Sequence, residues 1–275
     1  MKMILLISFS FFLLLNRVAR AQTEEPPATV DLSLKVGASL AYYRYVEPTL
    51  ISQTGFLIGA WLNWDYHLLF YRGVLQAEIH NGELNYDGAI CQIKTNQCSD
   101  YKAKTTDLIF KLAHRFTYDF NDTFSAFAGL GYRFLYDKGE GSGFYRRTGQ
   151  YLYVPVGFST RLEMNSWPGV LIFEAEYDYF LNGAIESKLS DVNSAYSDVN
   201  HKQNKGYAVR LTLSFEAQKK PDDLRAWNYG VYTERWSIAK SDRAELLENG
   251  VSSGTFFYEP ENFSETLGLK VGFSY

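Results

Sequence analysis

Long apolar runs and proline are both scarce in this sequence. After Gln22 no stretch of 18 apolar residues occurs, so the rest of the chain offers no transmembrane helix. Only 7 of the 275 residues are proline, whereas 21 are tyrosine and 20 are phenylalanine. A chain with this much apolar surface is not expected to be disordered. Its slightly negative mean hydropathy excludes an ordinary helical membrane protein.

The first 21 residues have the pattern of a secretory signal peptide. Lys2 precedes an apolar run from Met3 to Leu15, and Ala19-Arg20-Ala21 places small residues at positions −3 and −1 of a cleavage site. The run is about 13 residues long, shorter than the roughly 20 that a membrane-spanning helix needs, so a retained anchor is the weaker alternative. We therefore predict an exported protein from which residues 1–21 are removed.

Neither sign of charge dominates the chain strongly. The full sequence has 27 basic and 31 acidic residues. Removing Lys2, Arg17 and Arg20 with the signal peptide leaves 24 basic residues against 31 acidic ones, a formal charge of −7. This acidic excess argues against nucleic acid as a partner, because binding to nucleic acid depends on basic side chains that neutralise phosphates.

The two cysteines lie close together in a polar stretch, Cys91-Gln-Ile-Lys-Thr-Asn-Gln-Cys98. An exported chain meets an oxidising compartment, in which such a pair forms a disulfide. A metal site is the weaker alternative, because two thiols without a nearby histidine or second cysteine pair do not complete a tetrahedral site. The sequence therefore predicts a disulfide between Cys91 and Cys98 that closes a loop.

Apolar and polar residues alternate through the mature chain, and the C-terminal segment shows this most clearly. One parity there carries Leu267, Leu269, Val271, Phe273 and Tyr275, while small and polar residues occupy the other. A period of two predicts a β-strand. A soluble sandwich would bury the apolar face, whereas a transmembrane barrel would turn it to lipid.

Ten segments with this pattern can be marked along the chain: 32–46, 53–64, 69–86, 103–119, 123–138, 150–164, 170–186, 205–218, 224–240 and 263–275. Each is long enough for the roughly 9–11 residues that a tilted barrel strand needs to cross a bilayer. Segment 224–240 changes its apolar parity between Tyr229 and Trp236, which predicts a β-bulge there. The domain organisation that follows is a signal peptide at 1–21, a short periplasmic segment at 22–31 and one barrel domain at 32–275.

The links between these segments alternate in length. Every second link is short, as at Asp65–Leu68, Phe120–Asp122, Asn165–Gly169 and Lys219–Asp223. Most of the others are long and polar, including Asp87–Lys102, Ser187–Asn204 and Ser241–Asn262. Outer-membrane barrels have short periplasmic turns and longer external loops. We therefore predict an all-β protein, a closed antiparallel transmembrane β-barrel of about ten strands with this topology.

The signal peptide, the ten amphipathic segments and the terminal Leu267-Gly-Leu-Lys-Val-Gly-Phe-Ser-Tyr275 resemble a small Gram-negative outer-membrane β-barrel protein, in the style of opacity-type and OmpA-type barrels. The resemblance covers almost the whole mature chain but is architectural. It implies location in the outer membrane, lipid and lipopolysaccharide as surroundings, and insertion by the barrel-assembly machinery. It also implies that Val271, Phe273 and Tyr275 form the assembly signal, although phenylalanine is more usual at the last position.

The parity opposite to the lipid-facing one carries equal numbers of basic and acidic residues. Buried charges are tolerated when they are paired, so we predict ion-pair networks across the lumen. The expected members are Glu174, Glu176 and Asp178 on one strand and Arg133, Arg161 and Arg210 on others, with Arg161 and Arg210 neutralising the three carboxylates. A calcium or proton-handling site at the carboxylates is the alternative.

Catalytic residues are hard to find. Of the four histidines, only His80 is expected to face inward, two residues after Glu78 on the same face. Such a pair could serve as a base and its orienting group. However, no serine with the context of a nucleophile lies near either residue in sequence, and no pattern of a barrel protease, phospholipase or lipid A deacylase is recognisable. We therefore predict no enzymatic activity, no catalytic or metal-binding residues and no cofactor.

The function expected from these features is that of a surface structural or binding protein, similar to an adhesin, that acts through its external loops. Two of those loops carry exposed aromatic residues, which can recognise extracellular ligands. A small porin-like channel for solutes is the alternative, although a ring of charges of one sign would suit a selective pore better than a balanced set. An outer-membrane hydrolase is a more distant third possibility.

Overall fold

The computed structural model describes residues 32–68, 71–91, 98–141, 143–164, 168–219, 223 and 225–275. The predicted signal peptide (1–21) and the following segment (22–31) lie outside the described residues. Within the described part of the chain, no helix is long and apolar enough to cross a membrane. One short 3₁₀ helix, η1 (Leu189–Asp191), is present among these residues, and the regular structure is otherwise β.

Ten long strands form the main sheet. They are β1 (Leu32–Glu47), β2 (Ile51–Leu68), β3 (Tyr71–Cys91), β4 (Cys98–Asp119), β5 (Phe124–Gly139), β6 (Arg146–Glu163), β7 (Gly169–Ser187), β9 (Gly206–Ala217), β10 (Ala226–Ile238) and β13 (Asn262–Ser274). Three shorter strands, β8 (Val199–Gln203), β11 (Ala244–Glu248) and β12 (Val251–Phe257), lie in the two long links before β9 and β13.

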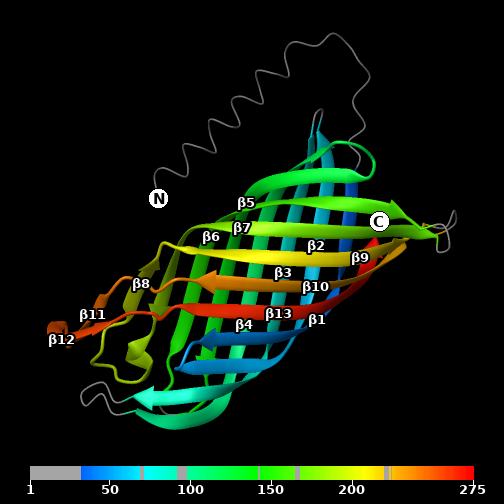
Figure 1. Ribbon diagram of the computed structural model, residues 1–275. Coiled ribbons are helices and arrows are strands. Elements are labelled where there is room, and N and C mark those ends of the chain that lie inside the picture. The colour runs from blue at the N-terminus through cyan, green and yellow to red at the C-terminus, as the bar shows by residue number, and fades with distance from the viewer. Residues whose placement is uncertain are drawn as a thin grey trace, which may run out of the picture. The chain divides into compact units, whose positions relative to one another are not determined.

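The ten long strands close into a barrel. Each pairs antiparallel with its neighbours in the order of the chain, and β13 pairs with β1 to complete the ring. The first and last long strands are in register from Lys35 opposite Ser274 to Val46 opposite Phe263. Figure 1 shows the strands wrapping around one lumen, with β8, β11 and β12 gathered at one end. The predicted fold class, a closed antiparallel barrel of ten strands, is confirmed.

We call the end with the short links the turn end and the end with β8, β11 and β12 the loop end. In the predicted topology these are the periplasmic and external ends. Strands β3 and β4 contain 21 and 22 residues, twice the number that a bilayer requires. Outward pairs of charged residues near the loop end, such as Lys104 and Glu83 at 2.8 Å, are about half exposed. Charged groups of this kind are costly in hydrocarbon, so the barrel extends beyond the apolar band on this side.

The apolar band faces outward, as the alternation predicted. Its members are large and exposed, and they come from strands all around the barrel, as shown by Leu40, Ile58, Ile79, Leu112, Leu130, Val156, Leu211, Val231 and Leu269. The inward positions between them are mostly buried. Because one face meets lipid and the other fills the lumen, a protein with 46% hydrophobic residues retains a slightly negative mean hydropathy.

The predicted bulge in segment 224–240 was wrong. Strand β10 pairs with β9 and β13 without a shift in register. Its parity changes because Trp236, which is 1% exposed, and Tyr232, which is 2% exposed, fill the lumen with aromatic rings at inward positions. The register shift of the barrel wall lies instead between β6 and β7, at Leu152 and Tyr153.

Candidate functional site

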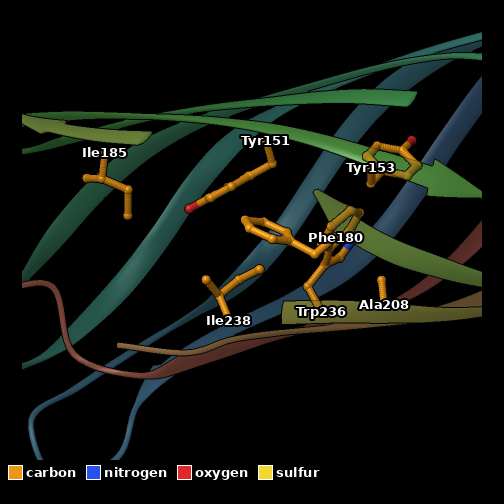
Figure 2. Close-up of a cluster of buried hydrophobic side chains, with 7 residues drawn as sticks. All are labelled: Tyr151, Tyr153, Phe180, Ile185, Ala208, Trp236 and Ile238. Carbon is orange, nitrogen blue, oxygen red and sulfur yellow. The ribbon is translucent and has the colours of Figure 1, made fainter. Parts of the chain in front are cut away.

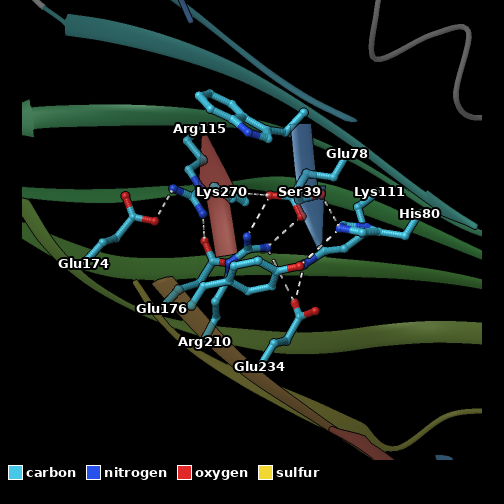
Figure 3. Close-up of polar contacts among 12 residues, drawn as sticks. Ser39, Glu78, His80, Lys111, Arg115, Glu174, Glu176, Arg210, Glu234 and Lys270 are labelled. Carbon is cyan, nitrogen blue, oxygen red and sulfur yellow. Dashed lines mark hydrogen bonds and ion pairs between the residues drawn. The ribbon is translucent and has the colours of Figure 1, made fainter. Parts of the chain in front are cut away.

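A network of charged side chains crosses the lumen near its middle (Figure 3). Glu78 on β3 accepts two hydrogen bonds from the guanidinium of Arg210 on β9, at 2.7 and 3.1 Å. It also accepts one from the ammonium of Lys270 on β13, at 2.6 Å. All three residues point inward from strands on different sides of the barrel. The ion pairs therefore span the lumen rather than run along its wall.

Two further residues extend this network. Lys111 on β4 donates to Glu234 on β10, and the guanidinium of Arg210 lies 3.9 Å from the same carboxylate. The side chains of Lys111, Arg210 and Glu234 are each less than 10% exposed. Breaking a buried pair of this kind costs more than the pair contributes, because it leaves a charge without compensation.

Two of the three carboxylates predicted as a cluster on β7 are paired with a different cation from the one predicted. Arg115 on β4 reaches across the lumen to donate to Glu174 at 2.9 Å and to Glu176. Arg210, which was expected to serve them, is committed to Glu78 instead. Adjacent strands suggested the wrong partner because long side chains cross a lumen as narrow as that of a ten-stranded barrel.

The remaining predicted members of the network lie apart from it. Both carboxylate oxygens of Asp178 are buried without a hydrogen-bond partner among the described residues. Arg133 donates to the hydroxyl of Ser264 at 3.2 Å and lies over the ring of Trp236, 4.8 Å from its centroid. Arg161 faces a cavity near the turn end, and its side chain makes no hydrogen bond or ion pair within the described part of the chain.

A layer of apolar side chains fills the lumen between this network and the loop end. One cluster contains Tyr151, Tyr153, Phe180, Ile185, Ala208, Trp236 and Ile238, and a second contains Tyr43, Tyr45, Leu57, Leu84 and Ile109. Figure 2 shows the side chains of the first cluster projecting into the lumen from several strands. Gly131 lies directly beneath the ring of Tyr153, where a Cβ would overlap the ring. Glycine on the inner wall thus lets a large ring pack close to the backbone.

Above the apolar layer, one arginine joins several elements at the loop end. The guanidinium of Arg147 on β6 lies 2.8 Å from Glu47, 3.1 Å from Asp137 and 3.5 Å from Glu259. Glu259 belongs to the link before β13 and accepts a hydrogen bond from Ser187 at 2.8 Å. Burial raises the pKa of Glu259, although the neighbouring Arg147 opposes this rise. We call Arg147, Glu47, Asp137 and Glu259 the mouth cluster.

The long links pack onto one another at this end. Leu189, Val199 and Leu246 form a small buried cluster against which Tyr145, Tyr196, Ala244 and Phe257 pack. Phe256 and Tyr258 in the second long link remain 58% and 45% exposed. The loops therefore bury part of their apolar surface against the barrel and leave another part open to solvent.

The lumen contains a cavity of about 150 Å³ between the midplane network and the turn end. Its lining runs from Glu78 and Lys270 at the midplane to Asp65 and Arg72 near the short links. The walls between carry small polar side chains such as Ser159, Thr212 and Ser214. The two halves of the lumen are therefore filled to different degrees.

His80 has a partner that the sequence did not reveal. Its Nε2 atom lies 3.0 Å from the hydroxyl of Ser39 on β1 and 3.1 Å from that of Tyr232 on β10. Serine and histidine in contact have the pairing that a nucleophile and its base need. Both side chains are buried, and Glu78, the expected orienting group, is held by Arg210 and Lys270. The register of β1, β2 and β3 brings them together, because Gly59 on β2 lies opposite both Ser39 and His80 and leaves room for their contact.

The backbone register places Cys91 on β3 opposite Cys98 on β4. Opposite residues of an antiparallel pair have Cα separations of about 4.5–5.5 Å, within the range that a disulfide spans. The disulfide itself stays a prediction.

Val271 and Tyr275 are exposed at the end of the chain, on the same outward parity of the last strand as Phe273. An assembly signal requires such exposure, and this role also stays a prediction. No group of three or more metal-binding side chains occurs in the described ranges.

No family model matches the sequence, and no curated protein matches it significantly. Among solved structures, the outer membrane protease OmpT from Escherichia coli is similar with a TM-score of 0.53 and 11% identity, over 93% of this chain and 99% of that one. The toluene transporter TodX from Pseudomonas putida gives a TM-score of 0.37 at 8% identity, over 88% and 89% of the two chains. The β domain of the Bordetella autotransporter BrkA gives 0.35 at 11% identity, over 86% and 98%.

The likeness to OmpT supports the predicted fold, a closed β-barrel of the kind found in the outer membrane, and no family is assigned; the location of this chain in the outer membrane stays a prediction. The prediction that the protein is not an enzyme is contradicted, because the barrel has the fold of an outer-membrane protease. At 11% identity this likeness shows the fold alone, so it transfers no catalytic residues. Linear motifs do not exclude catalysis in a barrel, since strand pairing joins residues such as Ser39 and His80 that lie far apart in the chain.

Proposed function

We propose that this protein is a closed-lumen barrel that acts at the cell surface as a binding protein through its loop end. The observation that carries the proposal is the filling of the lumen from the midplane to the mouth. Apolar side chains follow the ion-pair network, and the mouth cluster lies above them. A solute crossing the lumen would have to displace all three.

The shape of the loop end supports a role in binding. Strands β3 and β4 extend well beyond the apolar band and carry outward charge pairs into water. The second long link presents Val251, Phe256 and Tyr258, which are 68%, 58% and 45% exposed. Exposed apolar side chains on loops held by a rigid scaffold are typical of recognition surfaces. We propose this link as the principal contact with an extracellular ligand.

The partners expected from the resemblance fit the outer surface of the barrel. Arg44 and Arg235 flank the ring of Phe263 on the outward face, and both contact Glu265, at 3.6 and 2.5 Å. These charges lie at the loop-end edge of the apolar band, where the phosphorylated head groups of lipopolysaccharide would surround the barrel. The outward apolar residues of β13 remain available as the signal for the barrel-assembly machinery.

Planar-bilayer recording separates the binding role from the channel alternative. The purified full chain is expected to give no stable openings at neutral pH, because the midplane network and the apolar layer close the lumen. A variant lacking residues 249–254 is expected to stay closed as well, since the closure lies below the loops. Stable openings in both proteins would overturn the closed-lumen proposal and favour a porin-like role.

Retention of whole cells tests the binding role. Bacteria that display the wild-type barrel are expected to adhere to at least one of several coatings (fibronectin, laminin, collagen or mucin) more strongly than cells without it. A double substitution, Phe256→Ser with Tyr258→Ser, should remove this difference, whereas Leu50→Ser in the β1–β2 turn should not. Equal adhesion by wild type and the double variant would contradict a role for this link.

Because a protease shares the fold, the same cells should also be offered quenched fluorescent peptides. Cleavage by wild-type cells that is lost in His80→Ala but retained in His67→Ala would identify a hydrolase instead of a binding protein. His67 is a suitable control because it is exposed at the turn end, away from the Ser39 contact. If the cells cleave peptide in this way and do not adhere to any coating, the protein is a hydrolase and the binding proposal is wrong.

A further inference from the structure

The cavity near the turn end is lined by more cationic than anionic side chains. The cations are Lys35, Arg72, Arg115, Arg161, Arg210 and Lys270, and the carboxylates are Asp65, Glu78 and Glu174. Several of the carboxylates that pair with these cations lie outside the lining, as Glu216 does for Lys35 and Glu176 does for Arg115. The surface that faces the cavity is therefore richer in positive charge than the network as a whole.

Donor groups on this surface lack acceptors. The guanidinium of Arg161 makes no hydrogen bond or ion pair with any residue that the structure describes, and Glu216, with which it interacts electrostatically, already accepts from Lys35 at 2.7 Å and from Ser274 at 2.8 Å. The Nε atoms of Arg72 and Arg115 are buried without an acceptor in the described ranges, and Arg115 as a whole is 4% exposed. Buried N–H groups nearly always have a partner in folded proteins. Three guanidinium groups around one cavity thus leave donors that an acceptor could satisfy.

We propose that this cavity binds a small oxyanion, a phosphate or sulfate group, through the guanidinium of Arg161. Guanidinium groups bind such oxyanions through two parallel hydrogen bonds, which gives both strength and a defined orientation. The cavity of about 150 Å³ has room for a ligand of roughly the size of benzene, which cavities of this volume hold. Ser159, Thr212 and Ser214 on its walls provide further donors.

The position of the cavity defines how the ligand enters. Its lining reaches Asp65 and Arg72 at the turn end, whereas the midplane network closes the other side. In the predicted topology the ligand therefore comes from the periplasm and does not pass through. Glu174 also lines the cavity, but its carboxylate is engaged by Arg115 at 2.9 Å, so it is already partly neutralised. The proposal is independent of binding at the loop end.

Calorimetric titration of the purified full chain with inorganic phosphate, at constant chloride concentration, tests this site. Saturable binding of one phosphate per chain is expected. In separate competition measurements, added sulfate should displace phosphate and added chloride should not. Arg161→Gln should weaken the affinity at least about tenfold, because it removes both hydrogen bonds and the charge. Arg161→Lys keeps the charge but loses the planar fork, and should weaken the affinity by a smaller factor.

Arg225→Gln is the matched control. Arg225 also lies near the turn end, but it stacks on Phe273 at 5.5 Å and does not line the cavity. Its substitution should leave phosphate affinity unchanged. The proposal is overturned if wild type shows no saturable binding, or if Arg225→Gln lowers the affinity as much as Arg161→Gln. Heat-modifiable migration on a gel verifies that each variant still forms the barrel, and Arg161→Lys keeps the test decisive if Arg161→Gln does not fold.

Discussion

The two halves of the lumen are built from the same ten strands but differ in what fills them. Towards the loop end the inward positions carry large side chains, among them Tyr43, Leu57, Tyr153, Phe180 and Trp236. Towards the turn end small residues such as Ser159, Ser214 and Gly230 alternate with long cationic ones such as Arg72 and Arg161, and a cavity of about 150 Å³ is left between them. The strand number sets the radius of a barrel, so the size of the inward side chains decides whether the lumen is open.

The same contrast extends to the connections. At the loop end, long links fold back and bury Leu189, Val199 and Leu246, and Arg147 ties a link to the barrel wall through Glu259. At the turn end, the described connections are short, such as the one between β4 and β5. A barrel can therefore be closed and elaborated on one side while it keeps a blind cavity on the other.

The largest effect is expected at the boundary between the two halves. Glu78→Ala removes the carboxylate that compensates both Arg210 and Lys270, and leaves Lys270 without its partner and Arg210 with only the more distant Glu234, at 3.9 Å. We expect a loss of about 3–5 kcal/mol in the free energy of unfolding, as measured for other broken buried pairs. Urea titration in detergent micelles, followed by tryptophan fluorescence, measures this loss.

Glu83→Ala on the same strand is its control. The ion pair of Glu83 with Lys104 faces outward with both side chains about half exposed, so its loss should change the free energy of unfolding little. If the two variants were equally stable, the midplane network would not hold the barrel together. The network would then close the lumen without contributing to the stability of the barrel.

Two isoleucine substitutions compare the filled and hollow halves directly. Ile238 is 2% exposed in the apolar layer, whereas Ile172 lines the cavity and is only half-buried. Ile238→Ala should cost about 2–5 kcal/mol, since it opens a new cavity in packed surroundings. Ile172→Ala should cost less than half as much, because its side chain already borders empty space. The same urea titration measures both, and equal losses would show that the two halves are packed alike.

The sequence predicted the barrel well because strand patterns are local. Ten alternating segments correspond to the ten long strands, and the ends differ by a few residues, as in β1, predicted at 32–46 and observed at Leu32–Glu47. Strands β8, β11 and β12 were missed, since five to seven residues such as Val199–Gln203 are too short to show a period. The parity change in β10 was misinterpreted because apolar rings can fill a lumen as well as face lipid.

The partners of the inward charges could not be predicted in the same way. Parity places Glu78 and Arg210 in the lumen, but 132 residues separate them in the chain, and only barrel closure sets which inward side chains meet. Neighbouring strands suggested Arg161 for the carboxylates of β7, whereas Arg115 reaches them from β4 across the lumen. The contact of Ser39 with His80 was missed because it depends on the register of β1, β2 and β3, which parity alone does not set.

The attachment of the second long link to the mouth should depend on pH. Burial raises the pKa of Glu259 above its usual value, so its favourable contribution is complete below about pH 4.5 and is lost as the pH rises through the raised pKa. Glu259→Gln stays neutral at every pH. Hydrogen exchange of residues 239–261 should therefore match in the two proteins at pH 4, and should be faster in wild type at pH 7.

Comparison at equal pH removes the intrinsic dependence of exchange on pH. Glu261→Gln provides a control two residues away, at an exposed position of the same link, and should exchange like wild type at both values. Slower exchange of wild type than of Glu259→Gln at pH 7 would show that the ionised carboxylate, held by Arg147, stabilises the link instead. Burial would then be the weaker of the two influences.

The smallest effect is expected in the first long link, between β7 and β9. There an exposed ion pair depends on pH in the direction opposite to that of Glu259. Arg146 donates to Asp191 through two guanidinium hydrogen bonds, both at 2.7 Å, and these lower the pKa of Asp191 to about 2. The pair therefore contributes above about pH 4, the usual range of an aspartate, and is lost as the pH falls through about 2. Pepsin cleavage between residues 187 and 199 should increase as the pH falls from about 4 to about 2, relative to cleavage of unfolded casein.

Asp191→Asn should remove this dependence of cleavage on pH. An unchanged profile in that variant would show that the loop is held by the buried contacts of Leu189 and Val199, the same apolar filling that distinguishes the loop end from the turn end.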